Sequence, residues 1–92
     1  MNEAYKDLPL IDNAAKGRFE MTVEGHMAII EYTQKEDVIF LTHTEVPAAL
    51  EGKGVGAAIV EKALSFIEDN NYKLVPYCPF VVSYLKRHPE WK

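Results

Sequence analysis

The stretch from Glu51 to Val60, which reads EGKGVGAAIV, decides how this chain folds. Glycines occupy positions 52, 54 and 56, a lysine lies between the first two, and an apolar run follows without a break. Glycine loses more conformational entropy on ordering than any other residue, so a cluster of three needs a physical reason. Either the backbone turns sharply at this point, or another group approaches it closely.

Apolar residues after the loop recur at helical spacing and predict a helix from Gly54 to about Asn70. Asparagine tolerates the left-handed conformation, so the run Asp-Asn-Asn at 69–71 is suited to end this helix. The expected buried stripe consists of Val55, Ala58, Ile59, Ala63, Phe66 and Ile67.

Strands are predicted on both sides of this helix. Residues 38–46 (VIFLTHTEV) are β-branched, aliphatic and aromatic, and Pro47 ends the strand. Residues 72–78 (YKLVPYC) form a second strand, in which Pro76 indicates an edge, a bulge or a splayed end. A short helix over 79–88 follows, and its proline stands at the first position, where proline is favoured.

Upstream of these elements, alternating apolar residues predict a β-hairpin. The two strands are RFEMTVEG from residue 18 and HMAIIEYT from residue 26, and Glu24-Gly25 makes the tight turn. The resulting order of strands and helices predicts one α+β domain over residues 1–92, in which the main helix crosses between two strands of a mostly antiparallel sheet.

The first seventeen residues give weaker signals. Residues 1–8 are mixed in character, and we expect them to be frayed. Leu10-Ile11 is expected to start a short strand, which Asp12-Asn13 would turn. The role of residues 1–17 stays open at this level.

Composition narrows the class of protein. The chain has 92 residues, of which 48% are apolar and 26% charged, as in a globular domain rather than a disordered one. A formal charge of −4 argues against nucleic acid as a partner, and no apolar run approaches the ~18 residues of a membrane span. The N-terminus has no basic start followed by an apolar stretch, so we expect no signal peptide.

The chain has one cysteine and three histidines, and this limits the chemistry that it can carry out. Cys78 has no partner for an internal disulfide or a zinc site, which fits a reducing cytoplasm. The histidines lack the spacing of metal ligands on a helix, so we expect no metal site.

The glycine loop has several features that favour the binding of an anion. The first N–H groups of a helix lack partners within it, the helix dipole adds positive charge there, and glycine lets a phosphate approach the backbone. Lys53 adds a full positive charge. Glycines also serve ordinary strand-to-helix turns and close packing, so the cluster alone leaves both interpretations open. Two known phosphate motifs do not fit this sequence. The Walker loop of nucleoside triphosphatases has Ser or Thr after the lysine, where Gly54 stands here, and the dinucleotide fingerprint has a third glycine where Ile59 stands.

The loop resembles the coenzyme A loop of the GCN5-related N-acetyltransferases, in which Gln or Arg and two further residues precede a Gly-x-Gly or Gly-x-Ala. Residues 51–56 follow this pattern except that Glu51 stands where the family usually has Gln or Arg. LTHTEVP before the loop resembles the family's cofactor strand, and the segment 72–91 (YKLVPYCPFVVSYLKRHPEW) resembles its closing strand, helix and tail. The resemblance covers roughly residues 18–92 and is nearest to a minimal, stand-alone subgroup.

The resemblance implies where acetyl-CoA would lie. The strands 38–46 and 72–78 would splay and hold the cofactor in the split, with its pyrophosphate on the backbone amides of 52–57. The backbone of Val46 would bind the pantetheine arm and the acetyl carbonyl. The cofactor-binding residues implied in this way are Val46, Glu51, Gly52, Lys53, Gly54, Val55, Gly56, Ala57, Cys78 and Tyr84.

Cys78 is the candidate nucleophile. It directly precedes Pro79 at a predicted helix start, where the helix dipole favours the thiolate. The resemblance places this cysteine in the active-site cleft, as an acetyl-cysteine or a contact to coenzyme A. The alternative is a small buried residue, which is common for an unpaired cysteine.

Three further residues are candidates for proton transfer. By resemblance, Tyr84 is the acid that protonates the coenzyme sulfur; alternatively it is a core residue with its hydroxyl at the edge. His43 and Glu45 are two apart on one strand and therefore share a face, which suits a proton relay for the incoming amine. The alternative is a satisfied core histidine and a solvent-facing charge.

Three functions follow from these observations. The first is an acetyl-CoA-dependent N-acetyltransferase acting on a small-molecule or protein amine, as a monomer or a weak dimer that an exposed Trp91 or a sheet edge supports. The second is a coenzyme A binding module without catalysis. The third is an interaction domain in which the glycines serve packing alone.

Overall fold

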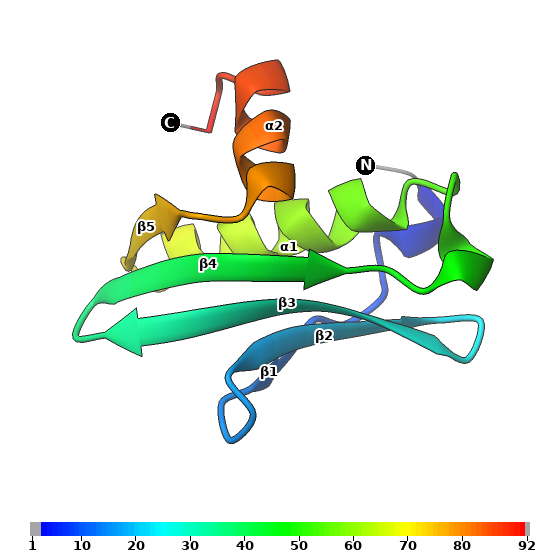
Figure 1. The fold of residues 1–92 in the computed structure, drawn as a ribbon, viewed down its shortest axis with the longest axis horizontal. Coiled ribbons are helices and arrows are strands. Elements are labelled where there is room, and N and C mark those ends of the chain that lie inside the picture. The colour runs from blue at the N-terminus through cyan, green and yellow to red at the C-terminus, as the bar shows by residue number, and fades with distance from the viewer. Residues whose placement is uncertain (1–2, 92) are drawn as a thin grey trace.

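In the computed structural model, which describes residues 3–91, a five-stranded sheet has the order β1-β2-β3-β4-β5. The first four strands are antiparallel, and β5 pairs with β4 in parallel (Figure 1). The α+β class is therefore confirmed. The elements are η1 Glu3–Tyr5, β1 Ile11–Asn13, β2 Arg18–Val23, β3 His26–Lys35, β4 Val38–Glu45, η2 Ala48–Leu50, α1 Val55–Asp69, β5 Lys73–Pro76 and α2 Pro79–Arg87.

The predicted hairpin is confirmed as β2 and β3. Glu24 and Gly25 make its turn with φ values of 53° and 81°, the two positive angles that a tight hairpin turn requires. Phe19 and Met21 of β2 and Ile30 of β3 are almost completely buried, so the alternation does assign the core face.

The helix α1 packs along one face of this sheet and forms the core with it (Figure 1). Its N-cap is Gly54, and its end at Asp69 is followed by Asn71 with φ of 60°, so the asparagine run ends the helix as predicted. The buried residues of α1 are Val55, Ala58, Ile59, Val60, Ala63, Leu64 and Ile67.

A bulge interrupts the pairing of β3 with β4. Glu31 lies opposite His43 and Tyr32 lies opposite Leu41, so Thr42 is an extra residue on β4. The extra residue reverses which side chains face the core. Leu41 points into the core before the bulge, whereas Thr44, opposite the buried Ile30, points there after it.

The strands β4 and β5 separate after four residue pairs. Their pairing runs from Val38–Lys73 to Leu41–Pro76, and then the N–H groups of Tyr77 and Cys78 both donate to the carbonyl oxygen of Leu41. The strand β5 therefore ends at Pro76, earlier than predicted, and the chain leaves the sheet to start α2. The splayed edge expected from the proline is confirmed.

The N-terminal expectations need correction. Residues 3–8 are not frayed, because Glu3–Tyr5 form a 3-10 helix and Tyr5 is 8% exposed. Asp12 and Asn13 do not turn the chain but belong to β1, which pairs with β2. Residues 1 and 2 lie outside the described part. At the other terminus, Trp91 is not exposed as expected; it is partly buried against the core.

Over residues 3–91, none of the helices is long and apolar enough to cross a membrane.

Candidate functional site

The glycine loop forms one wall of a cavity of about 240 Å³. The end of β4 leads through η2 into the loop, and α1 begins directly after it, so the cavity lies between the sheet edge and the N-terminus of a helix. The start of α2 closes the far side with Phe80. The lining residues are Val46, Leu50, Glu51, Gly52, Gly54, Val55, Gly56, Ala57 and Phe80.

Glycine is needed at these three positions for two different physical reasons. Gly52 and Gly54 have φ values of 78° and 76°, which other residues rarely adopt, and no atom of residues 3–91 lies within 4 Å of a Cβ built on either. Gly56 has an ordinary helical backbone, but a Cβ there would stand 2.7 Å from the end of the Phe80 ring. Two glycines therefore turn the loop and leave open space before it, and the third lets α2 approach α1.

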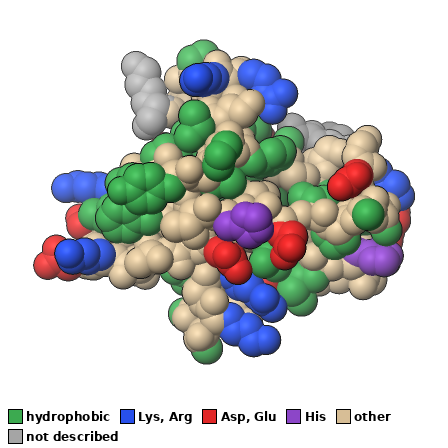
Figure 2. Space-filling model, viewed as in Figure 1, with side chains coloured by type: hydrophobic (Ala, Val, Ile, Leu, Met, Phe, Trp, Pro, Cys, Tyr) green, Lys and Arg blue, Asp and Glu red, His purple; other side chains and the backbone are tan. Residues whose placement is uncertain are grey.

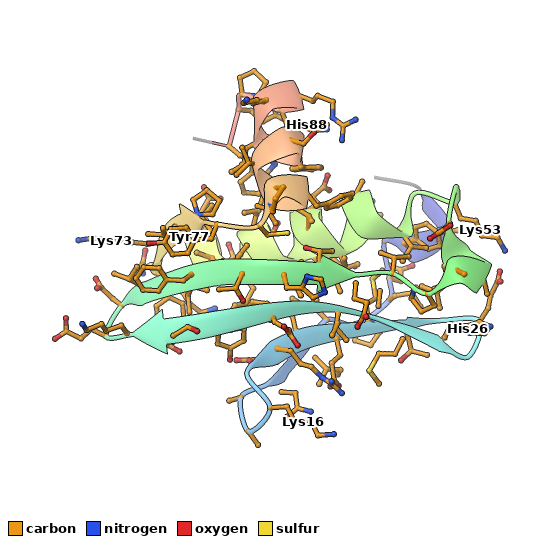
Figure 3. The ribbon with its side chains drawn as sticks, viewed as in Figure 1. Lys16, His26, Lys53, Lys73, Tyr77 and His88 are labelled. Carbon is orange, nitrogen blue, oxygen red and sulfur yellow. The ribbon has the colours of Figure 1, made fainter. Side chains whose placement is uncertain are left out.

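Charge at the loop is more balanced than the sequence suggests. The ammonium of Lys53 lies 3.3 Å from a carboxylate oxygen of Glu24 at the hairpin tip, and both side chains are exposed. Figure 3 shows Lys53 at that end of the molecule, where His26 also lies. Glu51 is exposed too. Lys53 does not line the cavity and Glu51 does, so the groups there that favour an anion are the backbone amides at the start of α1.

Cys78 and Thr44 meet between α2 and β4. Cys78 is the N-cap of α2 and is 4% exposed, and its sulfur lies 3.3 Å from the hydroxyl oxygen of Thr44. Burial disfavours the thiolate, but the Thr44 hydroxyl and the N–H groups of Val81 and Phe80 together outweigh it and lower the pKa of Cys78. Neither residue lines the glycine-loop cavity, but each is two residues before one that does: Thr44 precedes Val46, and Cys78 precedes Phe80.

Tyr84 lies farther along α2, with its hydroxyl turned toward α1. It is 2% exposed, donates a hydrogen bond of 3.1 Å to a carboxylate oxygen of Glu61, and stacks its ring on His88. Burial, together with the Glu61 charge and hydrogen bond, raises the pKa of Tyr84 to about 12. The phenol therefore stays protonated at neutral pH, and it does not line the cavity at the glycine loop.

His43 and Glu45 share one exposed face, as their spacing predicts, but it is the face turned away from α1. His43 lies opposite Glu31, and Glu45 lies opposite Ile29. Figure 2 shows a histidine with acidic side chains beside it over this part of the sheet. Thr44 lies between these two residues and points to the opposite side of the strand, and the bulge determines that Thr44 is the one that faces the core.

The structure thus gathers most of the expected loop residues around one cavity. It leaves Lys53, Cys78, Tyr84, His43 and Glu45 outside the lining, although Phe80, two residues after Cys78, belongs to it. Sequence reasoning missed Thr44, Leu50 and Phe80. The apolar Leu50 and Phe80 flank the glycines and the cysteine, a weak signal that could have been used. Nothing local marks Thr44, because its direction depends on the bulge.

A larger cavity of about 380 Å³ lies elsewhere, between the second half of α1, β5 and the C-terminal segment. Leu64, Tyr72 and Trp91 are among its lining residues, and none of the candidate residues is among them. We therefore base the functional argument on the smaller cavity, where a thiol, a helix N-terminus and a splayed strand edge come together.

Comparison with known proteins identifies the family of this chain. Residues 18–92 match the family of GCN5-related N-acetyl-transferases. The chain belongs to this family. The matched range starts at β2 and includes the bulge, the glycine loop and both helices.

Several relatives are called Protein NATD1. Those of Gallus gallus, Mus musculus and Homo sapiens are each 33% identical to this chain over 61 residues, which is 66% of it. The match covers 54%, 54% and 53% of these proteins, so the chain spans about half of their length. Membership in the family supports an acetyltransferase domain of the GCN5-related type for this chain.

Proposed function

We propose that this domain binds acetyl-CoA at the glycine loop and transfers the acetyl group to a primary amine. The observation that supports this most strongly is the cavity in front of Gly52 and Gly54, beside which the Thr44–Cys78 pair lies. It combines a place for a phosphate with a thiol whose pKa is lowered.

The residues of the loop fit the coenzyme. The open space beside Gly52 and Gly54 admits a phosphate close to the backbone, and the first N–H groups of α1, which have no side-chain cap, are available at the same end of the helix. A cavity of about 240 Å³ holds only part of a coenzyme. The rest would extend along the edge of β4 beyond Leu41, where β5 no longer covers it.

Cys78 supplies the chemistry of the first step. Its thiolate would attack the carbonyl carbon of the acetyl thioester, so that a new sulfur–carbon bond forms and the bond to the coenzyme sulfur breaks. The coenzyme leaves as a thiolate and is protonated by water. A neutral amine then attacks the acetyl-cysteine, an amide forms, and the thiolate of Cys78 is regenerated as the amine loses a proton.

His43 and Glu45 suit the amine side of this reaction. They lie on the open face of the strand that carries Thr44 on its other side, near the edge that β5 leaves uncovered. An imidazole there can accept the proton that the amine loses, and the neighbouring Glu31 and Glu45 carboxylates attract a protonated amine. The acceptor class is a small-molecule or protein amine.

The experiment is to incubate the protein with acetyl-CoA in the absence of amine and to map acetylation by peptide mass spectrometry. The proposal expects one acetyl group on Cys78, none in Cys78→Ser, and loss of the label with release of acetylated product when an amine is added. If Cys78→Ser binds acetyl-CoA and forms the amide product as well as the parent protein does, the acetyl group passes directly from the coenzyme to the amine and no acetyl-cysteine is needed. If no amine is acetylated, the proposed acetyltransferase activity is wrong.

A coenzyme A binding module without catalysis is the second candidate. The placement of Tyr84 favours it, because a buried phenol bonded to Glu61, with a pKa of about 12, is a weak proton donor to a leaving thiolate. This candidate expects unchanged coenzyme affinity in Cys78→Ala and Tyr84→Phe, together with no turnover.

A further inference from the structure

Tyr5 contacts the glycine loop across a large separation in sequence. Its hydroxyl donates a hydrogen bond of 2.8 Å to the carbonyl oxygen of Lys53, 48 residues away, and its side chain belongs to the hydrophobic core. Figure 1 shows the Glu3–Tyr5 segment beside the loop that precedes α1. A segment with no sequence signal of order therefore contacts the glycine loop of the candidate site.

The contacted carbonyl is at the most sensitive point of the loop. Lys53 stands between Gly52 and Gly54, both of which have positive φ and wide conformational freedom. A rotation at either glycine would redirect the peptide groups that face the cavity. A hydrogen bond to the carbonyl between them limits both rotations at once.

A second contact holds the same segment against α1. The ammonium of Lys62 donates a hydrogen bond of 3.0 Å to the carbonyl oxygen of Lys6, and Leu8 and Leu10 pack on the core. The segment is thus tied to the helix at one point and to the loop before it at another. The residues of the N-terminal segment lie outside the range 18–92 that matches the family, so family membership does not assign them a role.

We propose that Tyr5 is a positioning residue for the coenzyme site: its hydroxyl fixes the Gly52–Gly54 turn in the conformation that binds phosphate. The inference rests on the proposed function for the identity of the ligand, whereas the ordering of the loop by Tyr5 does not. It predicts that the N-terminal segment tunes affinity for the coenzyme rather than the reactivity of Cys78.

The test compares Tyr5→Phe with the parent protein and with Tyr72→Phe, which removes a hydroxyl near the opposite end of α1. The phenylalanine keeps the buried ring and deletes only the hydrogen bond. Without ligand, amide hydrogen exchange at residues 52–57 should become about five to ten times faster in Tyr5→Phe, as expected for one lost hydrogen bond. Affinity for coenzyme A should fall by a similar factor, while the pKa of Cys78 stays close to that in Tyr72→Phe and the unfolding midpoint falls only by the few degrees that one lost hydrogen bond costs.

Unchanged exchange at 52–57 in Tyr5→Phe would overturn the proposal whether or not coenzyme binds. Faster exchange with unchanged coenzyme affinity would also overturn it, because the ordered turn would then be irrelevant to binding. If the parent protein itself does not bind coenzyme A, the proposed function fails and the link to affinity fails with it. The exchange comparison then decides by itself whether Tyr5 orders the loop.

Discussion

Thr44 and His43 are neighbours in sequence, yet only Thr44 reaches the thiol of Cys78. Period-two alternation counted from the buried Leu41 would turn His43 inward and Thr44 outward. The extra residue Thr42 reverses this, and a bulge leaves no local mark that could be read in the sequence. The cap role of Cys78, in contrast, was predictable, because Pro79 marks the first position of a helix.

The first prediction concerns the Thr44–Cys78 contact. Replacing Thr44 with valine keeps the shape of the side chain and removes the hydroxyl, so the pKa of the Cys78 thiol should rise toward its ordinary value of 9.0. The rate of alkylation by iodoacetamide, followed against pH, measures this pKa. Thr42→Val is the matched control, because its hydroxyl bonds instead to the carbonyl of Glu31. Equal profiles for parent and Thr44→Val would refute the role of the hydroxyl.

At the scale of elements, the glycine loop and α1 were the best predicted parts of the chain. Their signals are local: glycines at a turn, an apolar stripe at helical spacing, and asparagines at the end. The individual reasons for the glycines were not predictable. Gly56 is needed because of Phe80, which approaches from a different helix, and that contact depends on tertiary structure.

The second prediction separates two effects of a side chain at Gly54: backbone strain, and blocking of the space where the phosphate would bind. Gly54→Ala places a Cβ on a residue with φ of 76° and should destabilise the fold by about 1–2 kcal/mol. Gly54→Asn should cost less, because asparagine tolerates the left-handed conformation. Both variants should bind coenzyme A more weakly, since each fills the space beside the loop. Urea unfolding and calorimetric titration give the two quantities; full affinity in the stable Gly54→Asn variant would remove Gly54 from the binding site.

At the scale of the whole molecule, the order of the main strands and helices and the crossing of α1 between two strands of one sheet were predicted correctly, whereas the parallel pairing of those strands was not predicted. The packing of residues 3–10 was not, because the partners of Tyr5 and Lys6 lie 48 and 56 residues away. Contacts of this kind depend on the assembled fold rather than on a local pattern. The same holds for the ion pair of Lys53 with Glu24, which joins the hairpin to the glycine loop.

The third prediction concerns stability at high pH. Burial comes first among the causes that raise the pKa of both Tyr32 and Tyr84 from 10.0 to about 12, with hydrogen bonds to Asp12 and Glu61 adding to it. The unfolded chain therefore loses these protons before the folded one does. Their contribution is complete below pH 10 and is lost as the pH rises toward 12.

Urea unfolding across this range should accordingly give a free energy of unfolding that falls above pH 10. Tyr84→Phe should make that fall shallower, and the remaining slope should include the part due to Tyr32. The comparison uses slopes, so a general loss of stability in the variant does not affect it. Identical slopes in parent and variant would contradict the burial of a neutral Tyr84.

The coenzyme site at the glycine loop is tested most directly by an amide-shift NMR titration of the labelled protein with acetyl-CoA, desulfo-CoA and ATP. We expect acetyl-CoA and desulfo-CoA both to shift Val46 and residues 52–57, and ATP not to reproduce the full pattern. Only acetyl-CoA should go on to change the signals around Cys78. If none of these amides shifts at near-millimolar coenzyme, the glycines serve the turn and the packing of α2 alone, and the proposed acetyltransferase site does not exist.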